Sequence, residues 1–84
     1  MRPAVPAGAL EGLRVAFARE AAERLPHLES LDDLETARRD AHTLASSAWV
    51  VGEPEISQLA RTVEEQLPDG PVAELVARLR AFAP

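Results

Sequence analysis

The chain has 84 residues, a formal net charge of −5 and no cysteine, so it has room for one small domain and excludes disulfides and thiolate metal sites. Its apolar residues, 46% of the chain, are mostly alanine, leucine and valine, and only 4% are aromatic, which favours closely packed helices over a sheet. The acidic balance argues against general binding of nucleic acid phosphates. No apolar run approaches the roughly 20 residues that span a bilayer, and the start lacks the apolar run of a signal peptide, so we expect a cytoplasmic protein without membrane association.

Residues 1–8 contain two prolines and a glycine and predict a disordered lead-in, so residues 9–84 are expected to form the single domain. Apolar residues then recur every three or four positions and predict one face of a long helix over roughly residues 9–30. Pro26 lies inside this helix and is expected to kink or divide it. The predicted apolar face comprises Leu10, Leu13, Phe17, Ala21, Leu25 and Leu28.

The next helix is predicted to begin after Asp32, whose side chain can cap the first turn. Glu35, three residues later, fits a capping-box partner of Asp32. Gly52 suits the end of this helix because glycine adopts the left-handed conformation that often terminates helices. The apolar stripe between these signals comprises Ala37, Ala41, Leu44, Ala48 and Val51.

Two further helices are expected, each opened by a proline at its first turn, Pro54 and Pro71. A strong turn signal, Pro68-Asp69-Gly70-Pro71, separates them. Four amphipathic helices joined by short turns predict an all-α protein, a compact antiparallel four-helix bundle with up-down topology. The expected core positions are Ile56, Leu59, Ala60, Val63 and Leu67 in the third helix, and Val72, Leu75, Val76, Leu79 and Phe82 in the fourth.

The run from His42 to Gly52, HTLASSAWVVG, resembles the signature of the histidine phosphotransfer (HPt) family. In that signature the phosphoacceptor histidine begins a run of the form His-x-Leu-Lys-Gly-Ser-Ala-x-x-hydrophobic-Gly. The positions in register with it are His42, Leu44, Ser47, Ala48, Val51 and Gly52. The resemblance covers roughly residues 10–67. It implies that His42 is the phosphoacceptor of a phosphorelay intermediate, which passes phosphoryl groups to or from the aspartate of a response-regulator receiver domain in two-component signalling.

Two positions depart from the signature, because Ala45 stands at the family's lysine and Ser46 at its glycine. In the family the lysine helps to hold the phosphoryl group, and the glycine lets the receiver domain approach. Arg38 and Arg39 precede His42 by one turn on the exposed side of the helix, and either is a candidate replacement for the lysine. Ser46 is a third candidate for contact with the phosphoryl group.

Partner docking is expected at Trp49, which follows His42 by two turns on roughly the same side, and at Ala45. For Trp49 the alternative is packing against the first helix. His27 matches no motif and is interpreted as a bystander, and the Glu64-Glu65 pair as plain surface. Arg38 and Arg39 fit a solvated face about as well as a phosphate role. The two histidines have no supporting ligand pattern, so neither a metal site nor a cofactor is expected in this chain, and Mg²⁺ is expected only on the partner receiver domain.

The main interpretation is therefore a monomeric phosphocarrier without enzymatic turnover, whose partners are a receiver domain, a hybrid histidine kinase or both. An alternative, favoured by Ala45 and Ser46, is a degenerate HPt-like module that binds a receiver or kinase without being phosphorylated. A third is a structural helical module with an accidental motif match. A histidine-kinase core is disfavoured because His42 is not followed by the acid and proline of that motif, and no ATP-binding glycine motif is present.

Overall fold

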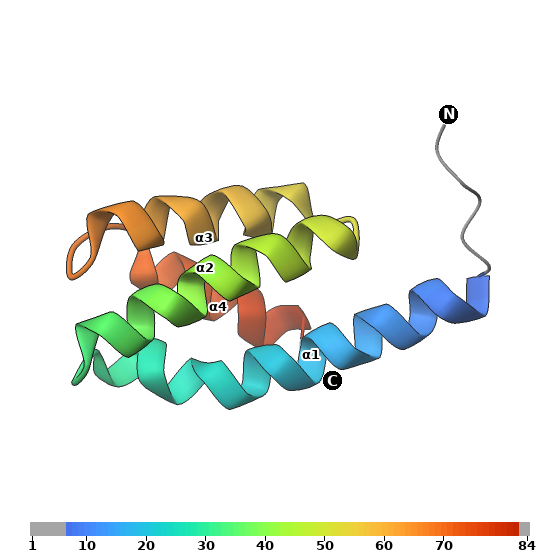
Figure 1. Cartoon of the computed structure of the whole chain (residues 1–84), viewed down its shortest axis with the longest axis horizontal. Helices are drawn as coiled ribbons and strands as arrows, with labels where there is room; N and C mark the ends of the chain where they lie inside the picture. The colour runs from blue at the N-terminus through green and yellow to red at the C-terminus, as the bar shows by residue number, and fades with distance from the viewer. Residues whose placement is uncertain (1–6, 83–84) are drawn as a thin grey trace.

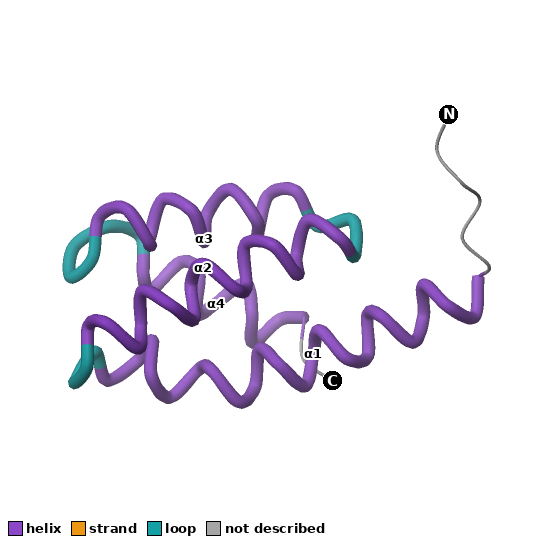
Figure 2. Tube along the Cα trace, in the orientation of Figure 1, coloured by secondary structure: helices purple, strands orange, loops and turns teal. Residues whose placement is uncertain are grey.

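The computed structural model describes residues 7–82, and in this part of the chain it contains four helices and no strand. They are α1 (Ala7–Ser30), α2 (Leu34–Val50), α3 (Pro54–Gln66) and α4 (Val72–Phe82). Each helix packs against its neighbours in the chain, and α4 returns to α1, so the four helices form a closed ring of contacts (Figure 1). The predicted antiparallel four-helix bundle is confirmed. Short loops join consecutive helices (Figure 2), which makes them antiparallel neighbours.

Helix α1 differs from its prediction in two respects. It runs without interruption through Pro26, so of the kink or division expected at this residue the division does not occur. Its N-terminal part extends past the ends of the other helices (Figure 1), and Leu10 and Leu13 are therefore exposed. The predicted disordered lead-in, residues 1–8, lies mostly outside the described residues, and its last two residues belong to α1.

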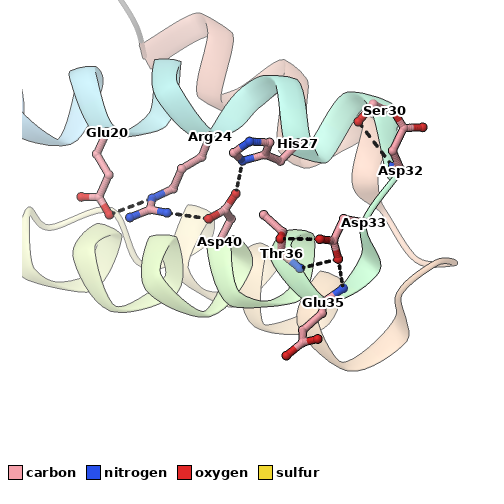
Figure 3. A network of polar contacts seen from close by, with 9 residues as sticks. All are labelled: Glu20, Arg24, His27, Ser30, Asp32, Asp33, Glu35, Thr36 and Asp40. Atoms are coloured by element: carbon pink, nitrogen blue, oxygen red, sulfur yellow. Dashed lines mark hydrogen bonds and ion pairs between the residues drawn. The ribbon is translucent and has the colours of Figure 1, made fainter.

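The start of α2 is capped by Asp33, and the prediction that Asp32 forms this cap is wrong. Asp33 Oδ1 accepts hydrogen bonds from the backbone N–H groups of Glu35 and Thr36, at 3.1 and 3.2 Å, and Oδ2 accepts one from the Thr36 hydroxyl at 2.9 Å (Figure 3). Thr36, and not Glu35, thus occupies the third position after the cap. Side-chain caps of this kind satisfy N–H groups that have no partner inside the helix.

The turn between α2 and α3 confirms the predicted roles of Gly52 and Pro54. Gly52 adopts φ +80°, and its N–H donates to the Trp49 carbonyl at 3.2 Å, while Glu53 N–H donates to the Ala48 carbonyl at 2.9 Å. These two bonds form a Schellman motif. Pro54 is the first residue of α3, whereas Pro71 directly precedes α4 and does not open it.

The core is formed by most of the predicted stripes of α2, α3 and α4 together with the inner part of α1, while the predicted core residues Leu59, Val72, Val76 and Phe82 are only partly buried against it. Its buried members are Phe17, Ala21, Leu28, Ala37, Ala41, Leu44, Ala45, Ala48, Val51, Ile56, Ala60, Val63, Leu67, Leu75 and Leu79. Two aromatic rings join the first and last helices, since Phe17 and Phe82 meet edge to face at 5.0 Å. None of the helices within residues 7–82 combines the length and apolarity of a membrane span.

Candidate functional site

His42 projects from the middle of α2, on the side away from the buried stripe, and 69% of its side chain is exposed. Its ring is nevertheless anchored, because Nδ1 lies 3.0 Å from Glu64 Oε2 and 3.2 Å from Oε1, on the neighbouring helix α3. The interpretation of Glu64 as plain surface was therefore wrong. Within the described residues Nε2 has no hydrogen-bond partner, and the side chain as a whole is largely exposed.

A shallow groove of about 550 Å³ surrounds His42 between α2 and α3. Helix α2 contributes Arg38, His42, Ala45 and Ser46, and α3 contributes Arg61, Glu64 and Glu65. Two arginines, Arg38 and Arg61, therefore line the same groove as the candidate phosphoacceptor. Because Arg38, Ala45 and Ser46 each lie three or four residues from His42, one face of that helix supplies them all.

Arg38 and Arg39, the two candidate replacements for the motif lysine, have different neighbours in the structure. Arg38 lines the groove with His42. Arg39 is not among the lining residues, and its guanidinium pairs with Glu35 one turn earlier, at 3.6 Å. Arg61, which the sequence analysis did not single out, lines the groove from α3. Of the two sequence candidates, Arg38 alone lies beside His42.

Ser46 and Ala45 both line the groove, but in different ways. Ser46 is exposed, and its hydroxyl lies 3.5 Å from the backbone carbonyl of His42. Ala45 is only 3% exposed, and the hydroxyl of Ser57 on α3 donates to its carbonyl at 2.7 Å. The burial of Ala45 corrects the expectation of a docking role, because its methyl group offers a partner almost no surface.

The family model of the Hpt domain matches residues 12–83, which extends the sequence resemblance through the fourth helix. The chain belongs to the Hpt domain family. Among curated proteins and among solved structures, none matches it significantly. Hpt domains are phosphocarriers of two-component signalling, whose partners are kinases and response regulators, so family membership supports a role in phosphotransfer.

In this Hpt domain Trp49 lies at the end of α2 and is 65% exposed, next to the exposed Val50. The alternative that Trp49 packs against the first helix is therefore wrong. Seven residues separate Trp49 from His42, which is nearly two helical turns, so both side chains leave the same side of α2. An exposed tryptophan on the histidine side is available for contact with a partner.

His27 belongs to a polar network between α1 and α2, so the interpretation of this residue as a bystander was wrong (Figure 3). Its Nδ1 lies 2.7 Å from Asp40 Oδ2, and Arg24 pairs with the other oxygen of that carboxylate. Arg24 also donates to Glu20 at 3.2 Å, and Glu20 accepts from Ser47 on α2 at 3.1 Å. This Hpt domain thus pairs each of its two histidines with a carboxylate, His42 toward α3 and His27 across the α1–α2 interface.

Proposed function

We propose that this Hpt domain is a phosphorelay intermediate that carries a phosphoryl group on His42. One observation carries the proposal: the only histidine in register with the family's phosphoacceptor is exposed in a groove that two arginines line, while one of its ring nitrogens is held by Glu64. This arrangement offers a fixed and accessible nucleophile together with cations that attract phosphoryl oxygens. The partners are a receiver domain, a hybrid histidine kinase or both.

The contact with Glu64 determines which ring nitrogen reacts. A neutral imidazole carries a hydrogen on one nitrogen and a lone pair on the other. A carboxylate 3.0 Å from Nδ1 accepts a hydrogen bond, which places the hydrogen on Nδ1 and the lone pair on Nε2. Since Nε2 is the nitrogen without a partner among the described residues, the nucleophile and the accessible atom coincide.

Transfer from a receiver then requires one substitution at phosphorus. The Nε2 lone pair attacks the phosphorus of the aspartyl phosphate, the P–N bond forms as the P–O bond breaks, and the aspartate leaves as a carboxylate. Nδ1 keeps its hydrogen, so the phosphorylated ring is cationic, and Glu64 neutralises that charge at hydrogen-bond distance. The reverse reaction returns the phosphoryl group by the same path. The receiver, with its own Mg²⁺, supplies the remaining electrostatic stabilisation.

Docking of the receiver is proposed to involve Trp49, because it is the large exposed apolar side chain on the His42 side of α2. Trp49→Ala should weaken binding of the cognate receiver by about tenfold or more, as loss of an interface hot spot does. Leu10→Ala, on the part of α1 that extends past the bundle, is the matched control and should leave the affinity unchanged. Equal affinities for all three proteins would contradict the docking role.

The decisive experiment incubates the protein with radiolabelled, phosphorylated receiver domains from the same genome. Wild type and His27→Gln should acquire acid-labile label, and His42→Gln should acquire none. If receivers bind wild type and His42→Gln equally and transfer label to neither, the domain is a degenerate docking module, the alternative that Ala45 favours. If no receiver binds at all, the bundle is a structural module and the proposal fails.

A further inference from the structure

Most of the arginines within the described residues form ion pairs with carboxylates, and a few do not. Of the eight within residues 7–82, five form ion pairs with carboxylates: Arg14, Arg24, Arg39, Arg78 and Arg80. In the same part of the chain Arg19, Arg38 and Arg61 form none. Two of these three line the groove that contains His42. The guanidinium groups beside the candidate phosphoacceptor are thus among the few that no carboxylate neutralises.

The register of α2 and α3 places Arg61 at one particular point of this groove. The Ser57 hydroxyl bonds to the Ala45 carbonyl, and Glu64 contacts His42. Arg61 lies on α3 between these two contacts, and it faces the stretch of α2 between His42 and Ala45. Position 45 is where the family signature has lysine. The methyl group of Ala45 is covered by the packing of α2 on α3 and carries no charge, while Arg61 lines the same groove from the opposite helix.

We propose that Arg61 supplies, from α3, the cation that position 45 lacks, and that with Arg38 it binds the oxygens of the phosphoryl group on His42. This inference rests on the proposed function and adds to it a residue for phosphoryl recognition. A guanidinium can donate two parallel N–H bonds to a phosphoryl group. Because Arg38 and Arg61 come from different helices, they approach the phosphoryl group from two sides.

The carboxylates in the groove do not compete strongly with this role. Glu64 is engaged with His42. Glu65 lines the same groove, but within the described residues it forms no ion pair with Arg38 or Arg61. A phosphoryl group has a charge near −2 and three acceptor oxygens, so it attracts guanidinium groups more strongly than one carboxylate does.

The test uses phosphoramidate, a small donor that can phosphorylate histidine without a partner protein. The rate at which phospho-His42 forms is measured for the full chain as wild type, Arg61→Ala, Arg61→Lys and Arg19→Ala. We expect Arg61→Ala to be about tenfold slower, because it loses a charge-assisted contact, and Arg61→Lys to retain most of the rate. Arg19→Ala, an unpaired arginine on the helix diagonal to α3, should match wild type. The defect should shrink at high salt, because the groove is open to solvent.

A second variant separates phosphoryl recognition from an effect on folding. Ser46→Lys on the Arg61→Ala background returns a cation to an exposed α2 position of the same groove, and it should restore most of the rate. Equal rates for Arg61→Ala and Arg19→Ala would overturn the inference while leaving His42 as the carrier. A defect that occurs with phosphorylated receivers but not with phosphoramidate would also overturn it, because Arg61 would then contact the partner. If neither donor labels wild type, the proposed function itself fails, and the inference fails with it.

Discussion

The two nitrogens of the His42 ring have different surroundings, and this asymmetry is the main chemical feature of the groove. Nδ1 is fixed by a carboxylate from a second helix, whereas Nε2 has no partner among the described residues. For the proposed phosphotransfer, this contact sets the tautomer and the ring orientation of His42 in advance. A lone histidine on a single exposed helix would rotate freely and would offer either nitrogen to a phosphoryl donor.

Glu64→Ala should slow phosphorylation of His42 by about tenfold, because the ring loses both its orientation and the carboxylate that balances the phosphoimidazole charge. Glu64→Gln should lie between wild type and Glu64→Ala, since the amide oxygen still accepts from Nδ1 but carries no charge. The measurement is the rate of label transfer from a phosphorylated receiver. Glu65→Ala is the matched control from the same groove, and a rate for Glu64→Ala equal to that control would contradict the role.

Asp40 has a different role, because it holds the bundle together away from the groove. Its side chain is only 5% exposed and is paired with Arg24 and His27. Asp40→Ala should lower the free energy of unfolding by about 1–3 kcal/mol, since it removes hydrogen bonds between charged groups at a buried position. His27→Gln should cost at most about 1 kcal/mol, because the His27 side chain is 53% exposed and its pairing is screened. Urea denaturation measures the free energy of unfolding of both variants. A larger decrease for His27→Gln than for Asp40→Ala would contradict this ranking.

The hairpin of α2 and α3 shows how much of the groove could be predicted. The motif identified His42, and the Gly52-Pro54 signals located the turn. His42 lies eleven positions before Glu53 and Glu64 lies eleven positions after it, so an antiparallel register around that turn would have brought the two together. Periodicity alone treats each helix separately, so it indicates a plain surface position for Glu64 and gives no role to Arg61. The burial of Ala45 could not be predicted, because it depends on how closely Ser57 approaches α2.

The cap of α2 leads to a prediction about pH. Hydrogen bonds from the backbone N–H of Thr36, from its hydroxyl and from the backbone N–H of Glu35 lower the pKa of Asp33 below its ordinary value of 3.8. A lowered pKa stabilises the folded state fully above pH 3.8, and this contribution is lost as the pH falls through the folded-state value. Asp33→Asn retains a cap that does not titrate.

As the pH falls from 5 to 2, the urea midpoint of wild type should therefore decrease relative to that of Asp33→Asn. Far-UV circular dichroism at each pH monitors the transition. A difference that stays constant over this range would show that the charge of Asp33 contributes nothing to folding.

Adding a methyl group should have opposite effects on stability at two glycines, Gly70 in the turn before α4 and Gly12 inside α1. Gly70 has φ +95°, and an added Cβ would lie 2.9 Å from the Gln66 Cβ, so Gly70→Ala should destabilise the fold by about 1 kcal/mol or more. Gly12 lies inside α1 with open space around it, and Gly12→Ala should stabilise by up to about 1 kcal/mol. Thermal unfolding of both variants tests the opposite signs, and a shift in the same direction for both would refute the argument.

The bundle as a whole is closed by contacts between its first and last helices. Phe82 packs edge to face on Phe17 at 5.0 Å, and the Arg14 guanidinium lies 4.8 Å from the centre of the Phe82 ring. Arg14 also donates to the Val51 carbonyl at 3.1 Å and pairs with Glu53 at 3.0 Å. One arginine thus joins α1 both to α4 and to the turn between α2 and α3.

Phe82→Ala should lower the free energy of unfolding by about 2–3 kcal/mol, because it removes the aromatic pair, the cation–π contact and part of the packing of α4. While the domain stays folded, phosphorylation of His42 should not change, since Phe82 contacts α1 and not the groove. Calorimetry and label transfer test the two statements. Val50→Ala, which alters an exposed side chain, is the control for stability and should have little effect. A slower transfer in folded Phe82→Ala would contradict the separation of core and groove.

For the molecule as a whole, the sequence predicts the four-helix bundle well because its apolar residues are regularly spaced. The stripes of α2, α3 and α4 all face the core, because the spacing that defines them is the spacing of one helix face, although Leu59, Val72, Val76 and Phe82 are only partly buried at its edge. Leu10 and Leu13 continue the stripe of α1 but are exposed. Whether these two residues are buried depends on where the other helices end, and the apolar spacing within α1 gives no information about that.

The closed ring of neighbours also bears on the order in which the molecule folds. Three of its four helix pairs are consecutive in the chain, so they can form through local encounters, which are fast. The pair of α1 and α4 joins the two ends of the chain and needs the largest loop closure. The hairpin that contains His42, Glu64 and Arg61 can therefore form before the ring closes. Because α2 packs more extensively on α3 than either end helix packs on its neighbours, thermal fraying should begin at α4, and the hairpin that carries the proposed phosphoacceptor should open last.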